Sequence, residues 1–533
     1  MTLARCLLVS LCFFGALPSL RAAPPDDVAS LVRQLGEADP ARREQAAAQL
    51  GRLGPQAAAA VEPLVAALGD EDLYLRGAAA VALGRIGGAA LPALTQALGS
   101  DDAGRRASAA IALGRLGVPA GQALPVLIRL LADPNEQVRQ VAAVTIGDLA
   151  GVDGVAGVGE AVPALTRCLS DRDEAVRRSA AVALARVAPG DRARQLRLEA
   201  LVATLDGLVP ALLAEHRVPG LAIALIRDRQ LVWSKGYGLR AAGSGEAVTA
   251  DTVFEAASMS KPIAAMLAMQ LVDAKRLALD RPMVAYGPEL LVPDLAEKRR
   301  VTARMLMSHT SGYPNWRPGG EETEGPLPLL FRPGSRFGYS GEGTFYLQRR
   351  VEWISGLPLD RLAQRSLFAP LGLAHSDFAW TPQIGDHQAT GHGDDGTPLP
   401  KSRYLHPNAA YTLYTSVDDY ARLLVEMLKA ERGESALLSR AAAREMLRHQ
   451  VAGIREPVER PGAAQGRASY WGLGWALNGT GQGDIAHHSG ANRTGFRSFS
   501  QFSPSRGSGL VILTNGTQGD AVWTRLVAAI GDL

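Results

Sequence analysis

The feature that most constrains this chain is a phrase of small and aliphatic residues that recurs through its first third. Residues 74–87 read YLRGAAAVALGRIG and residues 105–117 read RRASAAIALGRLG, with further copies near residues 41–54, 137–149 and 175–187. A second apolar stretch of helical character and an acidic turn separate successive copies. A helix pair of about 30 to 40 residues cannot bury both of its faces alone. The repeats therefore predict an α-solenoid in which neighbouring helix pairs stack.

Composition marks where the repeats end. Residues 24–194 contain one aromatic residue, Tyr74, and neither tryptophan nor lysine, whereas all seven tryptophans lie at or after Trp233. We expect a repeat domain over 24–194 and a globular domain over 195–533. The net charge is only +3 and no block of like charges occurs, so the sequence lacks the electrostatic signature of a nucleic-acid-binding protein.

Residues 1–23 have the pattern of a secretory signal peptide. A basic start at Arg5 precedes an apolar run over 6–17 and small residues before Ala23. The run is too short to span a bilayer comfortably, although an uncleaved anchor is the alternative. The pattern predicts export to the periplasm or the extracellular space and a mature chain without a transmembrane segment. Cys168 would then be its single cysteine, so no intramolecular disulfide is expected.

The globular part alternates strand-like and helical stretches. Residues 221–227 and 230–239 have the pattern of a hairpin, and 485–489, 496–502 and 508–514 have that of three more strands. Strands at both ends with helices between them predict an α+β domain whose ends meet in one antiparallel sheet.

One Ser-x-x-Lys occurs in the chain, formed by Ser258 and Lys261 at the start of the apolar helical run 263–273. Residues three apart share a helix face, and a helix N-terminus favours negative charge on a serine oxygen. A lysine can act as a base where burial or a cationic neighbour lowers its pKa, which an arginine cannot do. The chain has six lysines among 56 basic residues. Retention of Lys261 favours a catalytic pair over a helix cap beside a solvated lysine.

Two later segments add polar groups. Tyr339 lies in a glycine-rich loop over 333–343, and a tyrosine near a lysine can take a proton from a serine hydroxyl. His487 and His488 end a strand that continues Ser-Gly-Ala, which can bring backbone amides beside a substrate.

In this order, the three segments resemble the serine β-lactamase and penicillin-binding-protein superfamily, especially its class C and esterase-like branch. Supporting stretches at 218–222, 254–258, 307–312, 370–373 and 472–475 extend the resemblance over nearly all of 196–533. The repeats resemble the HEAT family, in five units over about 26–190. The resemblance implies a β-lactamase/transpeptidase-like domain after the solenoid, with an antiparallel sheet flanked by helices and a mainly helical lobe.

The resemblance also implies roles for individual residues. Ser258 would be the acylated nucleophile, Lys261 and Tyr339 would share the work of base and acid, and His488 would occupy the first position of the third motif. The backbone N–H groups of Ser258 and Ala491 would form the oxyanion hole. The candidate substrate contacts are Ser489, Gly490, Asn492, Glu342 and Trp316.

One departure affects the substrate. Gly341 stands where the superfamily's β-lactamases have the asparagine that holds a β-lactam side-chain amide. An esterase acting on a small ester or amide is therefore the first expectation, and a D,D-carboxypeptidase or β-lactamase is the alternative. A catalytically inactive binding protein, with the repeats as a platform for a protein partner, is the second alternative. Glu342 is expected either as a compensating polar group or as an exposed turn carboxylate.

Other polar and aromatic residues remain open to two interpretations. Adjacent strand residues point to opposite faces, so His487 and His488 cannot easily share a metal ion, and His387 with His392 lacks a ligand pattern. We expect no metal and no cofactor, and a loop-structuring role for His309. The aromatic residues that line a pocket or fill the core are Trp316, Tyr411, Tyr414 and Trp475.

Overall fold

The computed structural model describes residues 28–152, 154–188, 191–287, 296–318, 327–452, 469–480 and 483–530. The predicted leader, 1–23, lies outside the described residues. Internal contacts divide the chain into two units, Met1–Thr204 and Leu205–Leu533. The division falls within helix α12, Asp191–Glu215, and each unit is described by itself.

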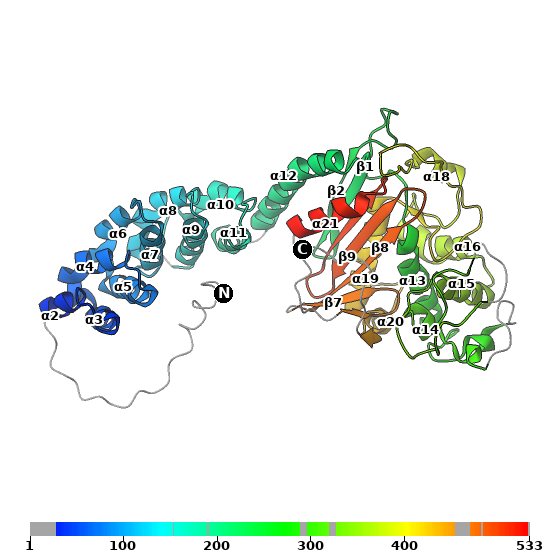
Figure 1. Cartoon of the computed structure of the whole chain (residues 1–533), viewed down its shortest axis with the longest axis horizontal. Coiled ribbons are helices and arrows are strands. Elements are labelled where there is room, and N and C mark those ends of the chain that lie inside the picture. Colours follow the sequence, from blue (N-terminus) through cyan, green and yellow to red (C-terminus); the bar gives the residue numbers. More distant parts are fainter. Residues whose placement is uncertain are drawn as a thin grey trace. The chain divides into compact units, whose positions relative to one another are not determined.

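The first unit is a solenoid of alternating long and short helices (Figure 1). The long helices carry the recurring phrase and are α3 (Pro40–Leu53), α5 (Leu73–Ile86), α7 (Ala103–Gly114), α9 (Glu136–Leu149) and α11 (Glu174–Val187). The short helices are α2 (Val28–Gln34), α4 (Val61–Ala67), α6 (Leu91–Ala97), α8 (Leu124–Leu130) and α10 (Val162–Cys168). One continuous core of buried alanine, leucine, isoleucine and valine runs through the stack, as the repeats predicted.

The small residues of the phrase lie where successive long helices cross. A Cβ atom at Gly51 would lie 3.0 Å from the Cα of Ala82, and one at Gly147 would lie 3.0 Å from the Cα of Ala183. The backbone of one long helix therefore lies directly against the backbone of the next, with almost no room for a side chain between them. A larger residue at these positions would separate adjacent repeats.

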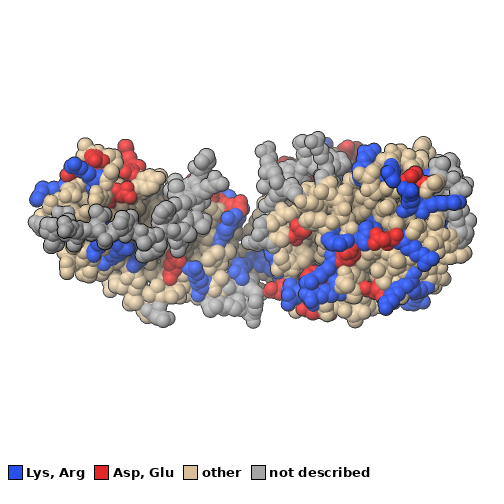
Figure 2. Space-filling view, turned by 90° about the horizontal axis from the view of Figure 1, so that it is seen from below, with Lys and Arg blue, Asp and Glu red and all other residues tan. Residues whose placement is uncertain are grey.

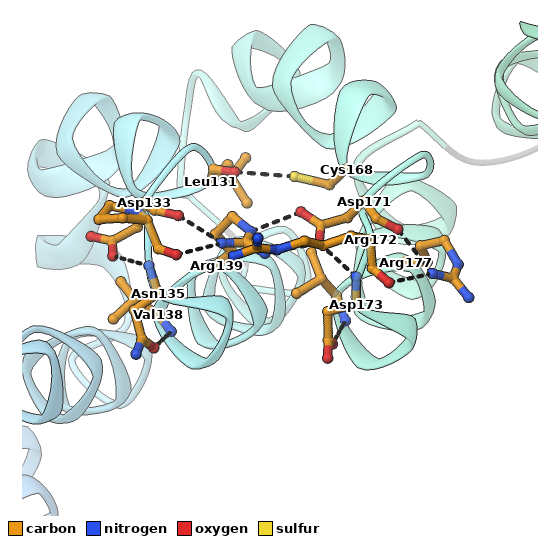
Figure 3. Close-up of polar contacts among 12 residues, drawn as sticks. Leu131, Asp133, Asn135, Val138, Arg139, Cys168, Asp171, Arg172, Asp173 and Arg177 are labelled. Atoms are coloured by element: carbon orange, nitrogen blue, oxygen red, sulfur yellow. Dashed lines mark hydrogen bonds and ion pairs between the residues drawn. The ribbon is translucent and has the colours of Figure 1, made fainter. Parts of the chain in front are cut away.

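The acidic turns between helices do two jobs. Their last residue caps the next long helix: Asp72, Asn135 and Asp173, for example, each accept a hydrogen bond from a backbone N–H of its first turn. The acidic residue two positions earlier in the same turn can accept an arginine from the preceding long helix. Figure 3 shows this pattern at Asp171.

Arginine and aspartate thus link consecutive repeats. Arg139 donates from Nε and Nη2 to the Asp171 carboxylate at 2.7 and 2.9 Å, while its Nη1 donates to the Asp133 carbonyl at 2.8 Å. Arg106 reaches the Asp133 carboxylate in the same bidentate way at 2.8 Å. Although burial opposes it, the bond from Arg139 holds the pKa of Asp171 below its usual value. These two pairs are nearly buried, so α7 is joined to the repeat of α9, and α9 to that of α11, by both packing and charge.

The second unit is built on an eight-stranded antiparallel sheet in the order β2-β1-β10-β9-β8-β7-β6-β5. The two ends of the domain meet in it, because Leu221 of β1 pairs with Thr514 of β10, as predicted. The strands of this sheet are β1 (Gly220–Arg227), β2 (Gln230–Gly238), β5 (Val451–Ala452), β6 (Ser469–Trp471), β7 (Ala476–Thr480), β8 (Gly483–Ala491), β9 (Arg497–Ser503) and β10 (Ser508–Thr514). A small second sheet pairs β3 (Phe254–Glu255) with β4 (Tyr414–Thr415).

The sequence indicated five strands of the main sheet, and the structure adds β5, β6 and β7. These three strands are two to five residues long, and glycines at 472, 474 and 479 interrupt the alternation that reveals a strand. Strand β7 pairs with β8, β6 with β7 and β5 with β6, so pairing within the sheet determines their conformation more than their own sequence does.

Helices cover both faces of the sheet and form the helical lobe (Figure 1). Helix α19 packs on β1, β2 and β10, and Trp523 of α21 stacks on Phe499 of β9 with ring centroids 4.5 Å apart. The helices are α13 (Ser260–Asp273), α14 (Ala303–Met307), α15 (Gly341–Ser355), α16 (Leu359–Ala363), α17 (Ala369–Leu371), α18 (Pro382–His387), α19 (Val417–Arg432), α20 (Arg440–Met446) and α21 (Gly519–Ile530).

The charge distribution on one face and the longest apolar stretch bear on the expected environment of the protein. On the face shown in Figure 2, Lys and Arg side chains lie among Asp and Glu side chains. Among the described residues, one stretch, Leu73–Ala97, is long and apolar enough to span a membrane. It consists of the repeat helices α5 and α6, and half of its most apolar window is buried in the unit.

Replacing Arg139 with alanine should destabilise the solenoid strongly, because it leaves the Asp171 carboxylate buried without its counter-charge. We expect a loss of about 3 kcal/mol in the free energy of unfolding, measured by denaturant titration of the full chain. Arg178→Ala is the matched control, since Arg178 pairs with Glu174 on the surface and should cost less than about 1 kcal/mol. Equal losses in the two variants would contradict the account.

Candidate active site

Ser258 and Lys261 meet at the start of α13. Ser258 lies in a separate 3₁₀ turn, Ala257–Met259, and α13 begins at Ser260, three residues before the apolar run over 263–273. Ala257, the first residue of the turn, has a positive φ of +50°. The Lys261 Nζ lies 3.1 Å from the Ser258 Oγ and 2.7 Å from the carbonyl oxygen of Ala410. Lys261 is 4% exposed, so the amine is buried beside the serine hydroxyl.

Several bonds hold the strained turn. The Ser260 hydroxyl donates to the Ala257 carbonyl at 2.6 Å and accepts from the Leu413 N–H at 3.0 Å. The Tyr420 hydroxyl donates to the Met259 carbonyl at 3.0 Å. A positive φ in a residue with a side chain costs free energy and persists only where its surroundings fix it. Ser260 and Tyr420 supply that support.

Tyr339 lies above the lysine. The Lys261 Nζ is 4.9 Å from the centre of the Tyr339 ring, so the hydroxyl, the amine and the phenol converge as the sequence predicted. His309 fixes the backbone that flanks this tyrosine. Its carbonyl accepts from the Gly338 N–H at 2.8 Å and its Nδ1 accepts from the Ser340 N–H at 3.1 Å. The predicted loop-structuring role of His309 therefore applies to the backbone on both sides of Tyr339.

His309 is neutral in this position. Burial, and then the positive charges of Lys261 and His488, lower its pKa well below the usual value. Because Nδ1 accepts a hydrogen bond, the ring proton belongs on Nε2. A neutral ring can contact Tyr339, at 4.4 Å between centroids, without adding a positive charge of its own to the site.

The other wall of the site is the end of β8. Strand β7 pairs with β8 only as far as His487, whereas β9 pairs with it as far as Ala491. The last residues of β8 therefore border the serine turn. His488 faces the site, with its ring 6.2 Å from that of Tyr339 and 5.6 Å from that of Trp471, while His487 lies near Phe499.

Gly490 allows β8 to approach the serine turn. A Cβ atom there would lie 2.1 Å from the Ala256 carbonyl oxygen and 2.3 Å from the Ser498 Oγ. The Ser498 hydroxyl donates to that same carbonyl at 2.8 Å. This contact sets the spacing between the two segments that carry the proposed oxyanion amides, Ser258 and Ala491. Gly490 thus contributes by having no side chain.

Glu255 is a buried carboxylate that the sequence did not assign a role. Its Oε2 accepts from Asn492 Nδ2 and Thr494 Oγ1, each at 2.7 Å, and from the Tyr404 hydroxyl at 3.1 Å. Burial raises its pKa to about 7, against the opposing effect of these three bonds. Glu255 therefore ties the strand before the serine to the turn after β8. An acidic residue in an otherwise apolar stretch three positions before Ser258 was the available signal.

Two candidate substrate contacts have partners within the protein. The Asn492 amide is engaged at both ends, since Nδ2 donates to Glu255 and Oδ1 accepts from the Phe496 N–H at 3.0 Å. Glu342 is not the exposed turn carboxylate that was one of its two expected roles, because it is buried and pairs with Arg317 at 3.1 Å. Ser489 remains exposed at the end of β8.

The ambiguous aromatic residues separate into two groups. Tyr414 and Trp475 are fully buried, and Trp475 packs against Phe502. Trp316 and Tyr411 are partly exposed and meet edge to face, 5.6 Å between centroids. The first two are core residues, and the second two border the site.

His387 and His392, which the sequence raised as a metal pair, have separate structural partners. His392 Nδ1 lies 2.8 Å from the Asn515 carbonyl, its Nε2 accepts from the Ala242 N–H, and the His387 ring lies against His375. Among the described residues, His, Cys, Asp and Glu do not gather in groups of three that could hold a metal ion.

A serine, a buried lysine and a tyrosine at the edge of an antiparallel sheet are the arrangement of the serine β-lactamase and penicillin-binding-protein superfamily. The family model described as beta-lactamase matches residues 205–532, so this chain belongs to that family. The model described as HEAT repeats matches residues 28–114, 102–185 and 124–213.

Individual relatives are consistent with membership of this family. Penicillin-binding protein 4 of Amycolatopsis lactamdurans is 32% identical, over 59% of this chain and 86% of the relative. Esterase EstB of Burkholderia gladioli is 27% identical, over 53% of this chain and 81% of the relative. The solved beta-lactamase/D-alanine carboxypeptidase of Pseudomonas syringae has the same fold, with a TM-score of 0.54 and 20% identity over 62% of this chain and 98% of that one.

Gly490→Ala should slow the reaction of Ser258 with a fluorophosphonate probe by about 100-fold, because the new methyl group displaces one oxyanion amide from the other. The rate of labelling measures this, with melting temperature as the check on folding. Gly207→Ala is the control, because its Cβ meets nothing within 4 Å. Labelling at the wild-type rate in Gly490→Ala would contradict the geometry.

Glu255→Gln should change how stability depends on pH. The folded carboxyl, with its pKa near 7 instead of 4.5, holds its proton longer than the unfolded one. That stabilisation is complete below about pH 4.5 and is lost as the pH rises through 7. The wild-type melting temperature should therefore fall relative to that of Glu255→Gln over this range. Glu246→Gln, at an exposed position, should follow the wild type; parallel curves for all three proteins would refute the assignment.

Proposed function

We propose that this protein is an exported serine esterase that acts on small esters through an acyl-enzyme at Ser258. The observation that carries the proposal is the 3.1 Å contact between the Ser258 hydroxyl and the buried amine of Lys261. Membership of the beta-lactamase family supports a serine hydrolase, and the substrate class follows from the second motif.

The arrangement suits proton transfer from Ser258. The Ala410 carbonyl can only accept a hydrogen bond, so it fixes one N–H of Lys261. In a neutral amine the lone pair can then face the serine hydroxyl and take its proton. As the proton leaves, the Ser258 Oγ bonds to the carbonyl carbon of the ester.

The next steps return that proton. The negative charge that develops on the former carbonyl oxygen lies between the backbone N–H groups of Ser258 and Ala491. Tyr339, in contact with both Lys261 and His488, delivers the proton to the departing alkoxide oxygen, and the alcohol leaves. Water then attacks the acyl-enzyme, gives a proton to the same groups, and releases the carboxylic acid and free Ser258.

The preference for esters rests on Gly341. It offers no amide to a β-lactam or peptide side chain, and an ester needs none. A D,D-carboxypeptidase or β-lactamase is the second candidate, because a relative of 32% identity is named penicillin-binding protein 4. Export is supported by the leader-like pattern of residues 1–23. The repeats are proposed as a platform for a protein partner, through the extended surfaces that such arrays present.

Fluorophosphonate and p-nitrophenyl acetate should modify the wild type and leave Ser258→Ala unmodified, as intact mass spectrometry would show. Lys261→Arg should turn over p-nitrophenyl acetate at least about 100-fold more slowly, because a guanidinium keeps its proton. Lys235→Arg is the control, since Lys235 is an exposed lysine paired with Asp206. Equal labelling of wild type and Ser258→Ala would favour an inactive binding protein.

The order of substrates is settled by comparing kcat/KM on short acyl esters, nitrocefin and a D-Ala-D-Ala peptide. The proposal expects the esters to be the best substrates. Faster hydrolysis of nitrocefin or of the peptide would favour the second candidate.

A further inference from the structure

Gly341 does more than omit an amide, because its side-chain space is already occupied. A Cβ atom at Gly341 would lie 2.7 Å from Cη2 and 2.9 Å from Cζ2 of Trp316, and 2.8 Å from the Asn315 carbonyl oxygen. No side chain fits at 341 while the indole is present. The tryptophan ring takes the place that a side chain at 341 would have.

The two segments that make this contact are locked together. The Gly341 and Glu342 N–H groups both donate to the Asn315 carbonyl at 3.1 Å, and the Asn315 Oδ1 accepts from Gly341 at 3.0 Å. The Glu342 carboxylate, one residue further on, accepts from the backbone N–H and the guanidinium of Arg317. These bonds fix the residues on both sides of Trp316, so its ring forms a rigid surface.

Two connections place that surface near the reacting groups. Gly341 is two residues from Tyr339, whose ring covers the Lys261 amine. On the other side, Trp316 meets Tyr411 edge to face, and Tyr411 directly follows Ala410, the residue whose carbonyl holds that amine. Both rings are partly exposed. An aromatic wall made of two nearly perpendicular rings therefore lies next to the segments that hold Tyr339 and the Lys261 amine, at the position of the missing amide.

We propose that Trp316 and Tyr411 bind the acyl group of the substrate and select apolar acyl chains over acyl chains that carry an amide. The proposal deepens the esterase assignment and rests on it. An aromatic wall gains free energy from covering methylene groups, whereas an amide placed against it loses hydrogen bonds to water and finds none in return. Glu342 and Arg317 act as positioning residues for the wall.

A pair of esters with acyl chains of equal length tests this directly. The substrates are p-nitrophenyl pentanoate and the p-nitrophenyl ester of N-acetylglycine, with p-nitrophenyl acetate as a reference too short to reach the wall. The wild type should prefer pentanoate. Trp316→Ala should reduce the ratio of the two kcat/KM values by about tenfold, and hydrolysis of acetate by the variant shows that it is folded and active. Trp316→Phe, which keeps a flat apolar ring, should retain most of the preference.

Trp353→Ala is the matched control. Trp353 lies on the same helix as Gly341, twelve residues or about 18 Å further along it, and is 60% exposed. This variant should keep the wild-type ratio. An unchanged ratio in Trp316→Ala, with acetate still hydrolysed, would overturn the inference and leave the esterase intact. A wild type that hydrolyses none of the three esters would overturn both.

Discussion

The hydrogen bond from the Lys261 amine to the Ala410 carbonyl is the interaction on which the rest of the site depends. It holds a buried amine at a fixed point, 3.1 Å from the Ser258 hydroxyl and beneath the Tyr339 ring. The surrounding structure serves this arrangement: Ser260 and Tyr420 support the serine turn, and His309 holds the tyrosine loop. Gly490 allows the end of β8 to approach the serine turn closely.

The sequence predicted the parts of the structure that local pattern determines. The repeats gave the solenoid, alternating strands gave the hairpin and the last three strands, and residue spacing brought Ser258 to Lys261. Contacts between residues far apart in the chain could not be predicted from the sequence. The Ala410 carbonyl carries no side-chain signal, and the burial of Glu342 depends on Arg317, 25 residues away. The short strands β5, β6 and β7 take their form from successive pairing that begins at β8.

The two units of the chain use charge in the same manner. In the solenoid, Arg139 and Asp171 join neighbouring repeats through a bidentate pair that packing shields from water. In the beta-lactamase-family domain, Arg317 and Glu342 join the segment of Trp316 to the start of α15, directly after the loop of Tyr339. Such pairs are costly to break from one side, so they fix geometry more than they add stability. Position 341 shows the consequence, since a glycine and a rigid indole together replace a polar contact with an apolar one.

The most direct test of the account is a crystal structure of the protein after reaction with a phosphonate ester. The account predicts a covalent bond from phosphorus to the Ser258 Oγ, with the phosphoryl oxygen about 2.7–3.1 Å from the backbone nitrogens of both Ser258 and Ala491. A phosphonate attached to any other residue, or one attached to Ser258 with its oxygen directed away from Ala491, would contradict it.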